Sequence, residues 1–176
     1  MQQYIESIDF SEYYGQYGYD LTKNYIQFYG NKGQDLFGNF WRLPKKISYN
    51  GVSANTVETL YHAAKFSQDI AIQFDDLEPL QAFYLSRKFK NQIRLDWNDV
   101  KENVMLDLLR IKFSIPMYTI VLLATGSRYL VEHNLIKGRD DYWSDNHDGS
   151  GKNRLGILLM KIREEFFGCG IVDKQQ

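Results

Sequence analysis

The sequence between positions 153 and 167 reads Asn153-Arg154-Leu155-Gly156-Ile157-Leu158-Leu159-Met160-Lys161-Ile162-Arg163-Glu164-Glu165-Phe166-Phe167. Its large apolar residues recur three and four positions apart, at Leu155, Leu158, Leu159, Ile162 and Phe166. Because an α-helix turns once every 3.6 residues, this spacing gathers them on one face. The stretch therefore predicts an amphipathic helix, from about 153 to 167, whose apolar face is buried in a core.

Further helices are predicted on the N-terminal side of this stretch, at about 55–69, 77–88, 99–113 and 116–126. The first begins where Asn55 is followed three positions on by Glu58, the spacing of a capping box. The second carries Pro79 in its first turn, where proline is tolerated. The third has an apolar stripe of its own at helical spacing. The chain is therefore expected to be mainly helical.

Short strands are predicted before and between these helices. Apolar pieces alternate with glycines between 25 and 40, and 47–52 reads as a strand or hairpin that ends at an Asn-Gly turn. Residues 128–133 form a further candidate strand. Because no repeat or linker divides the chain, we expect an α+β fold, a mainly helical single domain with a small sheet. Its expected limits are 26–170, with an N-terminal extension at 1–25 and a C-terminal tail at 171–176.

The 176 residues carry a net charge of −1, with 44% hydrophobic and 24% charged residues. Proteins that bind long nucleic acids usually show a positive excess, so extended nucleic-acid binding is not expected, while contact around one modified nucleotide stays open. The single cysteine cannot form an internal disulfide, which suits a reducing compartment. No signal peptide is visible, and the best apolar run, 115–124, is too short to span a bilayer. We therefore expect a cytoplasmic protein with no membrane contact.

The helix predicted at 55–69 carries a candidate catalytic face. Its members are four, three and four positions apart, and they are Glu58, His62, Lys65 and Asp69. A carboxylate, an imidazole and an amine in line suit acid–base or nucleophilic chemistry. The same spacing also fits a solvated polar stripe, in which Glu58 is only the capping-box glutamate.

A long polar loop, 134–151, precedes the last helix, and loops of this length in compact domains are often functional. It leads into Gly149-Ser150-Gly151-Lys152-Asn153, where N–H groups at a helix N-terminus favour an anion such as phosphate. The alternative is a flexible loop with Asn153 as an ordinary N-cap. The loop lacks the first acidic position of a calcium loop and the first glycine of a Walker loop. Since the three histidines also lack metal-ligand spacing, no metal is expected.

Aromatic residues make up 15% of the chain, thirteen of them tyrosines. Such rings either stack on a ligand or fill the core. Trp97, just before the helix predicted at 99–113, fits a stacking platform and equally a staple at the start of that helix.

A series of short motifs follows an order that resembles the NADAR family. The motifs are Phe28-Tyr29-Gly30, Gly38-Asn39-Phe40, Thr56-x-Glu58 with Ala64-Lys65-Phe66, Asp96-Trp97 with Lys101 and Met105, Lys112-Phe113, Leu123-Ala124-Thr125-Gly126, Leu130-Val131-Glu132-His133, Asp141-Tyr142-Trp143, and Gly151-Lys152-Asn153-Arg154-Leu155-Gly156 with Arg163. Each is weak alone, but together they cover about 26 to 167. Thr59 stands where many members have histidine, Gly38 where serine is usual, and Ser144 where glycine is usual. These departures bear on the substrate more than on the reaction, because the charged positions are kept.

The NADAR family includes bacterial N-glycosidases that cleave early riboflavin-pathway intermediates. It also includes domains that remove ADP-ribose from guanine bases, some of them antitoxins to DNA-modifying ADP-ribosyltransferases. The resemblance implies an N-glycosidase for an ADP-ribose or ribose-phosphate N-glycoside, carried on DNA or a free nucleotide, and no cofactor. We expect removal of ADP-ribose from guanine, with a toxin ADP-ribosyltransferase as functional partner. The alternatives are cleavage of riboflavin intermediates and a non-catalytic ADP-ribose-binding module.

The resemblance also implies site residues. The catalytic positions are Glu58, Lys65 and Asp141. The substrate-binding positions are Asn39, Phe40, His62, Trp97, Trp143, Gly151, Lys152, Asn153 and Arg154.

Two routes for the reaction follow from these residues. Breaking the C1–N bond builds positive charge on the sugar, which a carboxylate of Glu58 or Asp141 would stabilise while the other orients water. In the second route the sugar opens, and a neutral Lys65 captures C1 as an imine, which requires that burial lower the pKa of the lysine. In either route Trp97 or Trp143 stacks on the base, and 149–153 holds phosphate.

Overall fold

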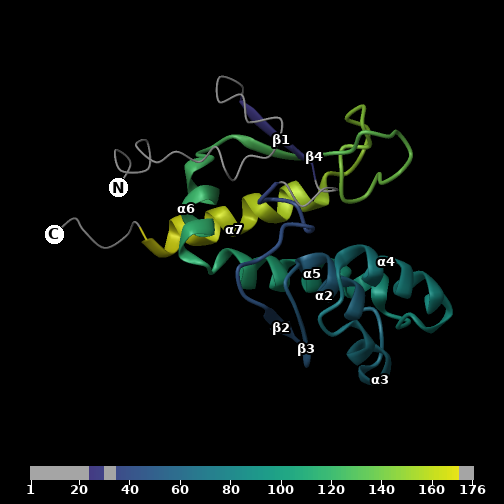
Figure 1. Ribbon diagram of the computed structural model, residues 1–176. Helices are drawn as coiled ribbons and strands as arrows, with labels where there is room; N and C mark the ends of the chain where they lie inside the picture. The colour runs from purple at the N-terminus through teal and green to yellow at the C-terminus, as the bar shows by residue number, and fades with distance from the viewer. Residues whose placement is uncertain (1–23, 30–34, 171–176) are drawn as a thin grey trace. The chain divides into compact units, whose positions relative to one another are not determined.

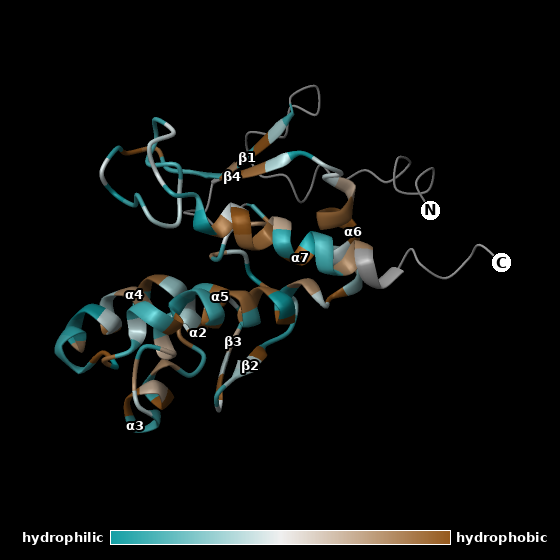
Figure 2. Cartoon of the chain, turned by 180° about the vertical axis from the view of Figure 1, so that it is seen from behind, coloured by the Kyte–Doolittle hydropathy of each residue, from teal (hydrophilic) through white to brown (hydrophobic). Residues whose placement is uncertain are grey.

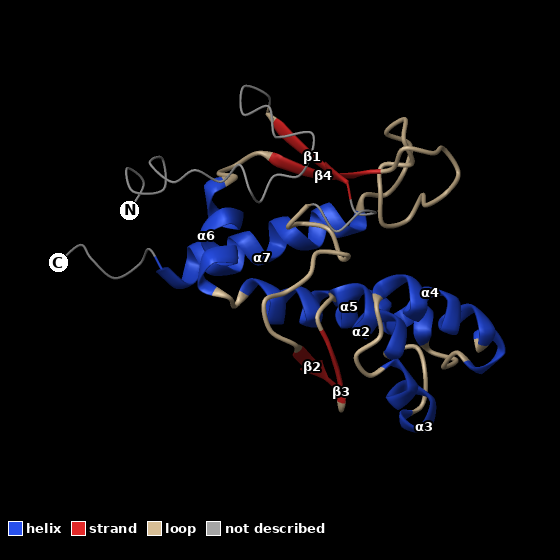
Figure 3. Cartoon of the chain, viewed as in Figure 1, coloured by secondary structure: helices blue, strands red, loops and turns tan. Residues whose placement is uncertain are grey.

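The computed structural model describes residues 24–29 and 35–170, and the fold is α+β and mainly helical, as predicted (Figure 3). Most of the expected extension at 1–25 and all of the tail at 171–176 lie outside the described residues. The chain divides into two compact units. Of the described residues, one unit holds 24–29, 35–38 and 113–170, and the other holds 39–112.

The first unit is built on a parallel pair of strands. Its described elements are β1 (Tyr25–Tyr29), α6 (Pro116–Ala124), β4 (Tyr129–His133) and α7 (Arg154–Gly170). β1 pairs with β4 in a register that sets Ile26 beside Leu130, and α7 packs on β4 and on α6 (Figure 1). Ile26, Phe28 and Leu130 are buried, because alternate side chains of a strand point to the same face.

Helix α7 is amphipathic, as its sequence predicted. Apolar and polar residues alternate along it in Figure 2, and Leu155, Leu158, Leu159 and Ile162 are buried. Gly156 allows the helix to approach β4 closely. A Cβ atom at this position would lie only 2.1 Å from the main-chain oxygen of Leu130. The missing side chain therefore sets the distance between helix and strand.

The second unit combines a hairpin with short helices. Its elements are β2 (Ile47–Tyr49), β3 (Val52–Ala54), α2 (Val57–Ala63), α3 (Gln68–Ala71), the 3₁₀ helix η3 (Ile72–Phe74), α4 (Pro79–Lys88), the 3₁₀ helix η4 (Lys90–Gln92) and α5 (Trp97–Phe113). Helix α2 packs on α4, on β3 and on η3. It is the central element of this unit, and six of its seven residues are buried.

The strands do not form the one small sheet that was expected. Within the described residues they make two separate two-stranded sheets, β1 with β4 and β2 with β3. The β2–β3 hairpin is closed by Asn50 and Gly51, whose φ angles of 48° and 77° are those of a type I′ turn. The tight turn pairs β2 with β3, the next strand in the chain. β1 instead pairs with β4, which lies about a hundred residues later in the chain.

The helix predicted at 55–69 ends earlier than expected. α2 stops at Ala63, and the N–H groups of Lys65 and Phe66 donate to the carbonyls three residues before them. Such bonds tighten the last turn of a helix and end it. A new helix, α3, then begins after Ser67.

None of the described helices is long and apolar enough to cross a membrane.

Candidate active site

Helix α2 brings three of the predicted site residues into direct contact. The Nε2 atom of His62 lies 3.0 Å from Oε1 of Glu58, and the Nδ1 atom of His62 lies 2.9 Å from Nζ of Lys65. His62 is only 6% exposed, and the Glu58 side chain 16%. Three members of the predicted face therefore form a continuous hydrogen-bonded chain from carboxylate to imidazole to amine.

The partners of His62 determine where its proton lies. A carboxylate only accepts hydrogen bonds and an ammonium only donates them. The Nε2–H of His62 therefore donates to Glu58, while its Nδ1 accepts from Lys65. This is a neutral imidazole held between one negative and one positive group.

Lys65 lies in surroundings that favour its neutral form. Burial lowers the pKa of Lys65 from 10.5 to about 8, and the charge of Glu58 opposes this shift. Its Nζ atom lies 5.3 Å from the ring centre of Tyr61 and 5.8 Å from that of Trp97. An amine with a lowered pKa can act as a nucleophile near neutral pH.

The carboxylate of Glu58 can contact His62 because Thr56, and not Glu58, caps the N-terminus of α2. The N-cap is Thr56, whose hydroxyl accepts from the N–H of Thr59, so the expected capping box of Asn55 and Glu58 is wrong. Thr59 is fully buried, and its hydroxyl donates to the main-chain oxygen of Leu77. Thr56 and Thr59 thus fix the start of α2 and leave the Glu58 carboxylate to His62.

Asp69 does not belong to this face, contrary to expectation. Because α2 ends at Ala63, Asp69 lies on the separate helix α3, where it is exposed. The fourth member of the predicted stripe is therefore lost where the helix ends.

Trp97 has the staple role that its sequence allowed, and its ring also lies beside Lys65. Its main-chain N–H donates to the main-chain oxygen of Arg94 where α5 begins, and its ring packs against Tyr61 with 5.0 Å between ring centres. Trp97 remains half-buried. It therefore staples the helix start and also forms an aromatic wall beside Lys65.

Asn39 lies at the beginning of α2, where its main-chain oxygen accepts from the N–H of Glu58. Its side chain is buried, and its amide oxygen has no hydrogen-bond partner among the described residues. The neighbouring Phe40 is half-buried. A buried acceptor of this kind is usually satisfied by a partner, and a ligand N–H or O–H would serve.

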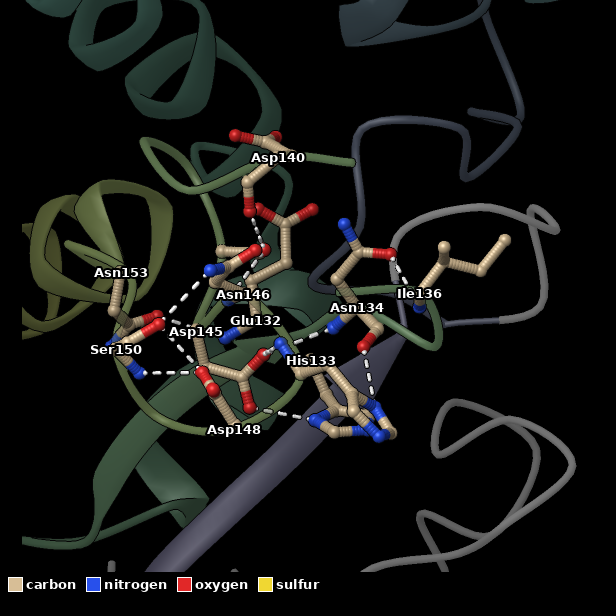
Figure 4. A network of polar contacts seen from close by, with 12 residues as sticks. Glu132, His133, Asn134, Ile136, Asp140, Asp145, Asn146, Asp148, Ser150 and Asn153 are labelled. Atoms are coloured by element: carbon tan, nitrogen blue, oxygen red, sulfur yellow. Dashed lines mark hydrogen bonds and ion pairs between the residues drawn. The ribbon is translucent and has the colours of Figure 1, made fainter. Parts of the chain in front are cut away.

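The first unit holds a second polar cluster, in the loop before α7 (Figure 4). Asp145 is its centre. One carboxylate oxygen lies 2.6 Å from Nδ1 of His133, and the other accepts from the N–H groups of Asn134 and His147. The cluster ties both ends of the loop to the end of β4, so this long connection has a defined conformation.

The N–H groups expected to bind phosphate are occupied within the loop. The N–H groups of Gly151, Lys152, Asn153, Arg154 and Leu155 donate to the main-chain oxygens of Asp145, Asp141, Ser144, Tyr142 and Trp143, respectively. The absence of a side chain at Gly151 serves the same packing, since a Cβ atom there would lie 2.2 Å from the oxygen of Ser144. The expected phosphate cradle of backbone N–H groups is therefore wrong, because residues 141–145 satisfy those donors.

The side chains around this segment lie in different environments. Asn153 is buried, and its amide group donates to the main-chain oxygen of Leu130 and accepts from the N–H of Glu132. Asp141 and Lys152 are exposed, with the Lys152 ammonium 5.2 Å from the ring centre of Tyr142.

The two remaining predicted site residues, Trp143 and Arg154, are half-buried. Among the predicted residues of this segment, Asn153 anchors α7 to β4, and the charged side chains of Asp141 and Lys152 reach solvent.

Several contacts escaped the sequence analysis. The pairing of His133 with Asp145 joins residues twelve positions apart, which no helical or strand period would connect. The sequence analysis did not single out Tyr61, yet its ring contacts both Trp97 and Lys65. Tyr61 lies four residues before Lys65, and this helical spacing could have indicated the contact with Lys65.

Most of the chain is similar to members of a known protein family. Residues 27–167 match the NADAR domain. The chain is 36% identical to N-glycosidase YbiA of Escherichia coli (strain K12) over 135 residues, which cover 73% of this chain and 79% of YbiA. The NMR structure of the E. coli protein YbiA matches with a TM-score of 0.72 and 33% identity, covering 86% of this chain and 89% of that one.

A longer relative is also similar. The riboflavin biosynthesis protein VVA0006 of Vibrio vulnificus is 39% identical over 132 residues, which are 72% of this chain but 34% of that protein. The chain thus spans about a third of the length of this relative.

Proposed function

The chain belongs to the NADAR family and is an N-glycosidase of that type, and we propose that it hydrolyses the C1–N bond of an ADP-ribose or ribose-phosphate N-glycoside through Lys65. The observation that carries the proposal is the hydrogen-bonded chain Glu58–His62–Lys65 beside the rings of Tyr61 and Trp97. It offers an acid–base pair, a lysine with a lowered pKa and an aromatic wall.

The substrate class follows from what a lysine nucleophile can do. A sugar attached to an exocyclic amino group can open its ring, giving an iminium at C1 while the ring oxygen takes a proton. The neutral Lys65 amine adds to C1, its proton passes to the base nitrogen, and the base leaves as a free amine. Water then hydrolyses the Lys65 imine, which releases the open sugar and restores the lysine.

Binding of the substrate is assigned to the residues around Lys65. Trp97 stacks on the base, and the buried amide oxygen of Asn39 accepts a hydrogen bond from the ligand. Lys152, which is exposed, stays a candidate partner for phosphate from the family resemblance alone. Asp141 stays a candidate catalytic residue from the family resemblance alone.

ADP-ribose on a guanine base is the first substrate to test. The resemblance to guanine de-ADP-ribosylating domains supports it, and an exocyclic amino group of guanine fits the chemistry of Lys65. With this substrate, the natural partner would be a toxin ADP-ribosyltransferase that places the modification.

A riboflavin-pathway intermediate is the second candidate, and the names of two relatives favour it. VVA0006 is a riboflavin biosynthesis protein, as is the maize chloroplast protein PYRR, which is 34% identical over 126 residues. The same Lys65 chemistry applies, because only the group attached to C1 and the phosphate differ.

The two substrates are distinguished by one experiment. The protein is incubated with a short DNA carrying ADP-ribosylated guanine, or with riboflavin intermediates, and the released sugar is followed by mass spectrometry. Release from one substrate by the wild type, lost in Glu58→Gln and Lys65→Ala, supports the proposal and names the substrate. Lys161→Ala, which removes an exposed lysine of α7, is the control and should keep full activity.

The lysine route has a direct chemical test. Borohydride added during turnover should reduce the imine and leave the sugar attached to Lys65, as peptide mapping would show. ADP-ribose that binds without release would support a reader module instead. Normal release with no trapped adduct would contradict the covalent route and favour direct hydrolysis assisted by Glu58 or Asp141.

A further inference from the structure

We propose that His62 is a positioning residue that relays a proton from Lys65 to Glu58, so that two coupled proton transfers prepare both the nucleophile and the acid. This inference rests on the proposed function and concerns how the same site becomes active. It also replaces the substrate-binding role expected for His62 from the sequence.

The position of His62 excludes a simple ligand contact. Both of its ring nitrogens are engaged within the protein, one with Glu58 and one with Lys65. Its ring is buried and meets the ring of Phe83 in an edge-to-face contact, with 5.8 Å between centres. An imidazole that bridges two ionisable groups in this way is suited to proton transfer, because it accepts at one nitrogen while it donates at the other.

The proton path follows from the hydrogen bonds. In the resting state Lys65 is an ammonium, His62 carries its proton on Nε2, and Glu58 is a carboxylate. Lys65 gives a proton to Nδ1 while Nε2 gives its own to Glu58. The product is a neutral amine, a neutral imidazole in its other tautomer and a carboxylic acid.

The same path serves both halves of the reaction. When the sugar opens, Glu58 gives its proton to the ring oxygen, and the neutral Lys65 adds to C1. When the imine is hydrolysed, Glu58 takes a proton from the attacking water. His62 then returns a proton from Glu58 to the nitrogen of Lys65. As the sugar leaves as an aldehyde, the hydroxyl group at C1 gives its remaining proton to the released amine, which restores all three residues to their resting state.

The groups around His62 and Lys65 leave Glu58 as the acceptor for the proton that Lys65 releases. Lys65 faces the rings of Tyr61 and Trp97, and its main-chain oxygen accepts from the N–H of Arg94.

The ring of Phe83, which packs against His62, carries the guanidinium of Arg87 4.7 Å from its centre. Arginine stays charged at all working pH values and takes no proton from a lysine. Glu58 is the carboxylate that contacts His62.

The test uses two variants at position 62 in the full chain. His62→Gln keeps a donor toward Glu58 and an acceptor toward Lys65 but cannot pass a proton. We expect kcat to fall about 100-fold or more, the usual contribution of positioned proton transfer, while KM stays unchanged because His62 does not touch the substrate. A matching fall is expected in the rate of borohydride trapping on Lys65. Thermal unfolding of both variants verifies that they fold.

His62→Ala provides the second readout, because it leaves a space of the size of an imidazole ring. Added imidazole should restore turnover, whereas 1-methylimidazole, which can accept a proton but has no second N–H to give, should not. Equal rescue by both compounds, or a wild-type kcat in His62→Gln, would overturn the proposal. If the wild type itself gives no trapped adduct on Lys65, the proposed lysine route has failed, and the relay fails with it.

Discussion

The Nζ atom of Lys65 lies 2.9 Å from Nδ1 of His62, so the side chain expected to act as nucleophile is bound to a neutral imidazole and not directly to a carboxylate. A direct ion pair would hold the lysine in its charged form. The intervening imidazole keeps the charge of Glu58 one side chain away, and desolvation therefore dominates the pKa of Lys65.

Replacement of Lys65 by methionine is expected to stabilise the protein at neutral pH. The pKa of Lys65 falls from 10.5 in the unfolded chain to about 8, a difference of about 2.5, so the charged amine costs the folded state up to about 3 kcal/mol. Urea unfolding of both proteins at pH 7 measures the difference.

The sign of its pH dependence follows from the same shift. Between pH 8 and 10.5 the unfolded chain binds more protons than the folded one, so the wild type gains stability as the pH rises through this window. The advantage of Lys65→Met should therefore shrink above pH 8. The exposed Lys161→Met should show no such change, and an advantage of Lys65→Met that is constant with pH would contradict the prediction.

Trp97 is expected to contribute to substrate binding more than to the chemical step. Trp97→Ala should raise KM about 10-fold or more, since stacking of a base on an aromatic ring is worth about 1–3 kcal/mol. Trp97→Phe keeps an aromatic face and should lose much less. Steady-state kinetics gives both values, and circular dichroism shows whether α5 still begins correctly. Trp143→Ala tests the alternative platform, and a larger KM effect there would move the base to the other unit.

Gly156 is expected to tolerate no side chain. In Gly156→Ala the new Cβ would lie 2.1 Å from the main-chain oxygen of Leu130 and 2.6 Å from Oδ1 of Asn153, so α7 must move away from β4. We expect a loss of about 3 kcal/mol or more in the free energy of unfolding, at the upper end of overpacking effects. Glu164→Ala, an exposed position on the same helix, should change it by less than about 0.5 kcal/mol.

Asp145 is expected to hold the conformation of the loop before α7. Asp145→Ala removes the acceptor for His133 and for the N–H groups of Asn134 and His147, and should cost about 2–4 kcal/mol. Hydrogen exchange at those two N–H groups should become faster. Asp148→Asn, which weakens an exposed ion pair with Lys137, is the control and should change the stability much less. Unchanged exchange in Asp145→Ala would mean that other contacts hold the loop.

The expectation that Glu58, His62 and Lys65 share one face was confirmed, because their geometry is local. Glu58, His62 and Lys65 lie within two turns of chain, so helical spacing alone places them together. Asp69, one turn further, was misplaced because the end of α2 depends on bonds that tighten its last turn. The cap at Thr56 was likewise missed, because Asn55 is an equally good capping residue in sequence.

In the loop before α7, by contrast, the prediction of a backbone anion site was wrong. Its glycines and the following helix start read as an anion site, yet residues 141–145 supply carbonyl oxygens to the N–H groups of 151–155. Nothing in the spacing of these residues indicates that the chain folds back on itself there. Only the folded loop shows which donors are already satisfied.

The sequence by itself determined most of the helices, the amphipathic register of α7 and the shared face of Glu58, His62 and Lys65, because these depend on periods of three to four residues that each segment carries alone. The tertiary structure decided that β1 pairs with β4, that Asp145 binds His133 and that Asn153 anchors α7 to Leu130. The physical reason is that such contacts join distant segments. Their energies depend on which buried donors and acceptors meet once the chain has closed, and no local pattern records that meeting.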